Sequence, residues 1–146
     1  KSLAGSQVKE LQLEIFKTPA ETSANVVGAQ LAAAPNLKVL SLRHTELGSR
    51  GVSALADGLV HVSALHLSNV GEIDAEAGLA LGRGIMHSGI TAVRFQELDM
   101  APGAAEAFCA ELAQCSRLEA LVLERCGIHH ASQALGASVA RLRSLS

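Results

Sequence analysis

Six histidines and three cysteines are the side chains of this sequence best suited to nucleophilic or metal chemistry. His129 and His130 are adjacent, so their side chains diverge on a strand or helix, and no third ligand follows at a metal-site spacing. Cys109, Cys115 and Cys126 have no such spacing either and cannot all form disulfides. We therefore expect no metal, no cofactor, and reduced thiols in the cytoplasm.

Nucleophilic catalysis also lacks a motif. A cysteine nucleophile needs a histidine base brought close by the fold, and Cys109 follows Phe108 on an expected helix face, where a free thiol is usually buried and inert. No serine lies in a G-x-S-x-G elbow, and no phosphate-binding loop is present. The residues favour a protein that is not an enzyme.

The elements that must position the polar side chains follow an internal repeat. The pattern apolar-x-x-apolar-x-apolar recurs in steps of 29, 25, 28 and 28 residues, and a truncated sixth copy starts at Leu142 after a further 24. Such periods indicate stacked supersecondary units. The five full copies are Val8-Leu11-Leu13, Leu37-Leu40-Leu42, Val62-Leu65-Leu67, Ile90-Val93-Phe95 and Leu118-Leu121-Leu123.

Each short strand-like motif is followed by apolar residues three or four positions apart, which predict a helix. Asp74 is a candidate N-cap for the third helix, and Pro102 suits the first turn of the fourth. Strands stack about 4.8 Å apart and helices about 8–10 Å apart, so the array must curve. We expect one α/β domain over residues 1–146, with parallel strands on the concave side and helices outside. The helical sets are Val27 and Leu31; Val52, Leu55 and Leu59; Ala77, Leu81 and Ile85; Ala105, Phe108 and Leu112; Leu135 and Val139.

Two segments resemble leucine-rich repeats of the ribonuclease-inhibitor-like subclass. One is Leu37-x-x-Leu40-x-Leu42-x-x-Thr45-x-Leu47-Gly48-x-x-Gly51-x-x-x-Leu55-Ala56-x-x-Leu59; the other is Leu118 to Leu123 with Cys126, Gly127 and Ile128. The resemblance spans nearly the whole chain and implies a solenoid of about five repeats that recognises a protein partner. Members of this subclass leave two alternatives open: a GTPase-activating regulator of the Ran-activator type, or the substrate-recognition arm of a ubiquitin ligase or bacterial effector.

The family's turn position usually holds Asn or Cys, whose side chain satisfies backbone groups. Here that position holds Phe16, Thr45, Val70, Leu98 and Cys126. Only Thr45 and Cys126 suit it, so the other turns must satisfy their backbones in another way.

Composition excludes several classes of function. With 12 Lys and Arg against 14 Asp and Glu, the formal net charge is −2, which argues against nucleic-acid binding and a polybasic membrane surface. No run of 18 apolar residues predicts a membrane span. Leucine (22) and alanine (25) suit small, repeated core spaces better than one irregular interior. Because the first residue is Lys1, we expect a fragment of a larger protein.

The candidate binding site lies on the concave face, where residues alternate with the core positions of each strand. Stacking should bring Arg43, His66 and Arg94 together, an arrangement that favours an acidic or phosphorylated segment of a partner. His66 should add charge as the pH falls towards its usual pKa of about 6.5. Glu14 and Glu124 should flank the centre and repel acidic ligands that miss it. The six candidate residues are Arg43, His66, Arg94, Ser41, Gln96 and Glu124.

Overall fold

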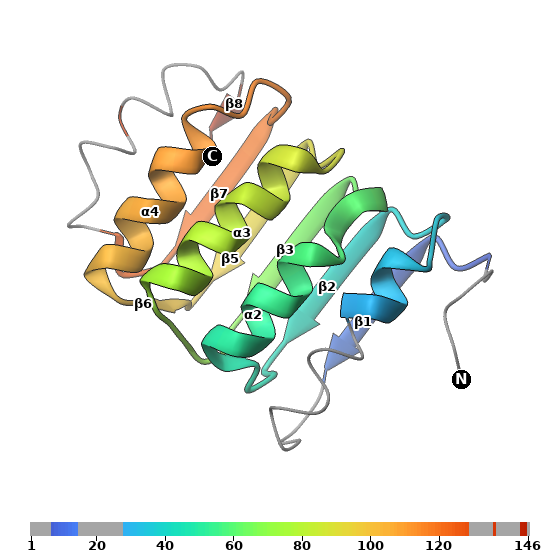
Figure 1. Ribbon diagram of the computed structural model, residues 1–146, viewed down its shortest axis with the longest axis horizontal. Helices are drawn as coiled ribbons and strands as arrows, with labels where there is room; N and C mark the ends of the chain where they lie inside the picture. The colour runs from blue at the N-terminus through green and yellow to red at the C-terminus, as the bar shows by residue number, and fades with distance from the viewer. Residues whose placement is uncertain (1–6, 15–27, 129–135, 137–143, 146) are drawn as a thin grey trace.

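A computed structural model describes residues 7–14, 28–128, 136 and 144–145, and its main element is a six-stranded parallel sheet (Figure 1). The strand order is β1-β2-β3-β5-β7-β8, so each strand lies beside the next one of this sheet along the chain. The strands are β1 (Glu10–Glu14), β2 (Val39–Arg43), β3 (Ala64–Ser68), β5 (Ala92–Gln96), β7 (Ala120–Glu124) and β8 (Ser144–Leu145).

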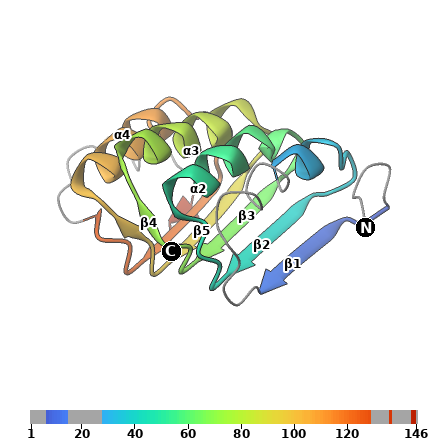
Figure 2. The same cartoon turned by 60° about the horizontal axis from the view of Figure 1, so that its bottom comes forward.

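The described helices form a layer over one face of this sheet (Figures 1 and 2). They are a short helix over 28–32, α2 (Gly48–Asp57), the 3₁₀ helix η1 (Leu59–His61), α3 (Ala75–His87) and α4 (Pro102–Leu112). A helical crossover is how successive parallel strands are joined. The expected α/β class with a parallel sheet is therefore confirmed.

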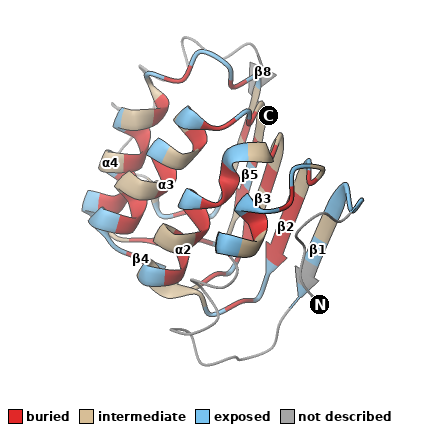
Figure 3. Ribbon diagram, turned by 45° about the vertical axis from the view of Figure 1, so that its right-hand side comes forward, coloured by how far each residue is buried: buried red, intermediate tan, exposed pale blue. Residues whose placement is uncertain are grey.

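The core lies between the sheet and the helix layer, where buried residues face each other (Figure 3). Leu40, Leu65, Val93 and Leu121 lie level on adjacent strands, and each is at most 2% exposed. From the helix layer, the predicted sets of α2, α3 and α4 are buried against them, together with Leu31 and with Leu59 in η1. The remaining expectations for Val27, Leu135, Val139 and Leu142 lie outside the described residues.

Strands β2, β3, β5 and β7 begin two residues later than the apolar motifs suggest. The first motif residue, such as Leu37 or Val62, is buried in the preceding turn and contributes to the core without joining the sheet. Lys9 O accepts hydrogen bonds from both Lys38 N and Val39 N at this junction. The chain therefore enters these four strands next to an apolar side chain that already faces inward, whereas Val8, at the same position before β1, is 38% exposed.

The predicted helix starts of α3 and α4 are confirmed. Oδ1 of Asp74 accepts a hydrogen bond of 2.9 Å from Ala77 N at the start of α3, and this contact lowers the pKa of the Asp74 carboxyl. Pro102 occupies the first turn of α4, where its missing N–H costs nothing. Directly before α3 and α4 in the chain, β4 (Glu72–Ile73) and β6 (Asp99–Met100) form a separate two-stranded parallel sheet that the sequence does not predict.

A left-handed residue follows each of four strands directly. His44, Asn69, Glu97 and Arg125 have φ between 50° and 54°, a region that non-glycine residues seldom occupy. The N–H groups of the first three extend the strand ladder by bonding to Ser68 O, Gln96 O and Glu124 O. These turns satisfy much of their backbone through main-chain bonds, which explains why Val70 and Leu98 are tolerated in buried turn positions.

Candidate interaction surface on the sheet

The candidate site occupies the open face, which we define as the face of the six-stranded sheet turned away from the described helices (Figure 2). Parallel pairing in register arranges its side chains in three rows across the strands. The apolar row contains Val39, Ala64, Ala92 and Ala120; the central row contains Gln12, Ser41, His66, Arg94 and Val122; the outer row contains Glu14, Arg43, Ser68, Gln96 and Glu124.

Hydrogen bonds link four strands through the central and outer rows. Nδ1 of His66 lies 3.4 Å from Oγ of Ser41, and Nε2 lies 3.1 Å from Oε1 of Gln96. Nε2 of Gln96 donates to Oε2 of Glu124, whose Oε1 accepts a 3.3 Å bond from the guanidinium of Arg94. Five of the six candidate residues thus belong to one connected network.

The two arginines of the predicted centre, Arg43 and Arg94, have different surroundings. Arg94 forms an ion pair with Glu124, so its charge is compensated. Arg43 is exposed and forms no ion pair with a described residue. The expectation that Glu124 repels ligands from the flank needs correction, because its carboxylate contacts Arg94 and Gln96 instead.

The pKa of His66 lies below its usual 6.5. Partial burial is the main cause, and the nearby charges of Arg43 and Arg94 lower it further. The hydrogen bond to Gln96 and the carboxylate of Glu124 oppose this shift without cancelling it. Our expectation from the ordinary pKa is therefore corrected: His66 gains its charge at a lower pH.

Beyond the outer row, the open face is hollowed at the ends of the strands. The hollow has a volume of about 790 Å³. Within it, the guanidinium of Arg125 lies 3.2 Å from Oε1 of Glu97. The lining residues are Arg43, His44, Ser68, Gln96, Glu97, Glu124 and Arg125.

No family model and no curated protein matches this chain. The functional argument therefore depends on the geometry of the described residues.

Two features of the hollow lie outside the six candidates. Glu97 and Arg125 are left-handed turn residues that pair across neighbouring turns, and Ser68 presents a hydroxyl level with Arg43. The register of the apolar motifs places Ser68 in the outer row and Glu97 and Arg125 one residue beyond it. Their pairing was not predictable, because it depends on a backbone conformation that glutamate and arginine rarely adopt.

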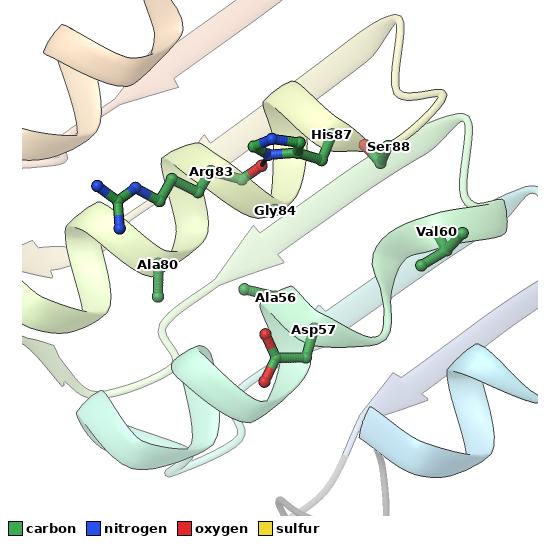
Figure 4. A pocket seen from close by; sticks show the side chains of 8 residues that line it. All are labelled: Ala56, Asp57, Val60, Ala80, Arg83, Gly84, His87 and Ser88. Atoms are coloured by element: carbon green, nitrogen blue, oxygen red, sulfur yellow. Dashed lines mark hydrogen bonds between the residues drawn. The ribbon is translucent and has the colours of Figure 1, made fainter.

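A second hollow, of about 510 Å³, lies in the helix layer between α2, η1 and α3 (Figure 4). Asp57 and Val60 line one side, and Val60 is 58% exposed. On α3, His87 donates from Nδ1 to the carbonyl of Arg83 at 2.9 Å, while the Arg83 guanidinium pairs with Glu111 on α4. The side chains of Arg83 and His87 are thus engaged within the helix layer.

The three cysteines are buried, and none of them forms a disulfide. Burial raises the pKa of Cys109 to about 11 and also raises the pKa of Cys126, which keeps both thiols protonated at neutral pH. Among the described residues, no group of three His, Cys, Asp or Glu side chains could hold a metal ion; His129 and His130 lie outside those residues. None of the described helices has the length and apolar character needed to cross a membrane.

Proposed function

We propose that the chain is a curved solenoid of about five leucine-rich repeats of the ribonuclease-inhibitor-like subclass. The strands of the main sheet begin at residues 10, 39, 64, 92, 120 and 144, which are intervals of 24 to 29 residues. Equivalent apolar residues lie level in every described strand pair, as stacking of similar units requires. The left-handed residue after each of four strands supports the same unit.

The proposed function is recognition of a protein partner by the open face, within a larger protein and without chemistry of its own. The observation that carries this proposal is Arg43, an exposed guanidinium without an ion-pair partner among the described residues, beside an ordered polar network. An unpaired arginine on a preorganised surface favours an acidic segment, because its planar fork binds carboxylate or phosphate.

The chemistry of the cysteines supports a cytoplasmic setting for this function. Three buried thiols without disulfides suit a reducing compartment. The raised pKa values of Cys109 and Cys126 mean that neither thiol is an activated nucleophile. This supports a binding role over an enzymatic one.

Photo-crosslinking in cells tests which surface meets the partner. A photo-reactive residue in place of Gln12 lies on the open face outside the hydrogen-bonded network, and one in place of Glu106 on α4 is the matched control on the helix layer. Both native side chains are exposed. We expect a specific protein adduct from position 12 and none from position 106. An adduct from position 106 alone would overturn the proposal.

A further inference from the structure

Two polar side chains of the hollow at the strand ends have no hydrogen-bond or ion-pair partner among the described residues. Arg43 and Ser68 lie level on β2 and β3, and both line it. Ser68 is only 9% exposed, and its hydroxyl forms no hydrogen bond with a described residue. Because Ser68 lines the hollow, its unpaired hydroxyl is available to a ligand that enters it.

The other charges of the hollow are already paired. Glu97 is held by Arg125, and Glu124 is held by Arg94 and Gln96. Glu14 lies level with Arg43 on β1 but forms no ion pair with it. Among the described residues that line the hollow, Arg43 is therefore the one arginine without a carboxylate partner.

We propose that this hollow binds a single aspartate or glutamate carboxylate of the partner, between Arg43 and Ser68, and discriminates against phosphoryl groups. This inference rests on the proposed function, since it names the chemistry that the open face recognises. Glu97 and Glu124 then determine specificity, because they occupy the guanidinium groups of Arg125 and Arg94.

Charge balance is the physical reason for the discrimination. A carboxylate carries one negative charge, which Arg43 neutralises with its planar fork while Ser68 donates a further hydrogen bond. A phosphoryl group carries about −1.5 to −2 at neutral pH. Among the described residues that line the hollow, no second unpaired cation is present to neutralise its extra charge.

Two small probes test this directly: N-acetyl-aspartate N-methylamide and N-acetyl-phosphoserine N-methylamide. Each is titrated into the isotopically labelled chain at pH 7.5 and constant ionic strength, following the amide signal of Ser68 and the Nε–H signal of Arg43. We expect the aspartate probe to bind more tightly, and Arg43→Gln to weaken it roughly two- to five-fold, as for an exposed ion pair. Equal or tighter binding of the phosphoserine probe would overturn the proposal.

A charge-matched pair of variants isolates the specificity residues. Glu97→Gln releases Arg125 into the hollow and should improve phosphoserine binding more than aspartate binding. Glu106→Gln makes the same change of charge at an exposed position of α4 and should leave the ratio of the two probe affinities unchanged. If Glu97→Gln leaves the ratio unchanged, or if neither probe shifts Arg43 and Ser68, the carboxylate site is wrong. Position-12 crosslinking still reports separately on whether the open face binds a protein.

Discussion

Nε2 of His66 lies 3.1 Å from Oε1 of Gln96, and this contact fixes how the imidazole is protonated. The carboxylate of Glu124 only accepts hydrogen bonds, so the amide of Gln96 must turn its Nε2 group towards Glu124 and its Oε1 towards His66. Nε2 of His66 is therefore the donor, and Nδ1 accepts from the hydroxyl of Ser41. The neutral ring satisfies both of its nitrogen atoms.

This arrangement predicts an acid-sensitive contribution of His66 to stability. Because the folded-state pKa lies below 6.5, the unfolded chain binds more protons as the pH falls below 6.5. Stability attributable to the neutral ring is thus present above pH 6.5 and is lost as the pH falls towards the folded-state pKa. Proton NMR of the His66 ring should give a midpoint below 6.5.

Two substitutions check the causes of the low pKa. Arg43→Gln should raise the pKa of His66, because it removes a nearby positive charge, and Glu124→Gln should lower it, because it removes a negative one. A midpoint at or above 6.5 in the unmodified chain would contradict the assignment.

Replacing Thr45 by valine should stabilise the fold, because the threonine hydroxyl is buried. Thr45 is 5% exposed, and its Oγ1 has no hydrogen-bond partner among the described residues. Thr45→Val replaces the buried hydroxyl by a methyl group and should raise the free energy of unfolding by about 1 kcal/mol. Urea denaturation measures the change.

Ser88 supplies the opposite control. Its buried hydroxyl donates to Ile85 O at 2.8 Å and accepts from Ile90 N at 3.3 Å. Ser88→Ala should therefore lower the free energy of unfolding by roughly 1–3 kcal/mol. Destabilisation of similar size by Thr45→Val would show that Oγ1 has a partner.

The close approach of α4 to Gly78 of α3 leaves no room for an additional methyl group, so alanine at this position should lower the stability of the fold. A Cβ at this position would lie 2.5 Å from Ala104 O and 2.9 Å from its Cα, which are backbone atoms that cannot move aside. Gly78→Ala should destabilise the chain by about 1–3 kcal/mol despite the better helix propensity of alanine. Thermal or urea unfolding is the measurement.

Gly103, on the first turn of α4, is the matched control. A Cβ there would meet only Cβ of Ala75, at 3.4 Å. Gly103→Ala should be neutral or stabilise by up to about 1 kcal/mol. Equal effects at positions 78 and 103 would contradict close packing between the two helices.

The sequence located the main strands and helices because their apolar spacing reports directly on burial. Leu40 and Leu65 recur with the spacing of stacked strands, and Phe108 and Leu112 with that of a helix face. The small sheet of Glu72–Ile73 and Asp99–Met100 was missed, because strands of two residues contain too few positions to show a period.

The sequence predicts which residues of the candidate site lie level on adjacent strands, but it does not predict which side chains form ion pairs. Strand alternation places His66 beside Arg94 on adjacent strands, as the structure has them. Glu124 pairs with Arg94 on the adjacent strand, while Arg43 has no ion-pair partner among the described residues. This difference depends on side-chain conformations, which apolar spacing does not encode.

The affinity of the purified crosslinked partner for surface variants tests the central claim most directly. Arg43→Glu reverses the unpaired charge of the open face. The matched control exchanges Arg83→Glu with Glu111→Arg, which keeps an ion pair on the helix layer. With both variants confirmed as folded by circular dichroism, we expect Arg43→Glu to weaken binding at least about ten-fold, as at an interface hot spot, and the exchange to leave the affinity unchanged. Loss of binding in the exchange variant, with full affinity in Arg43→Glu, would contradict recognition by the open face.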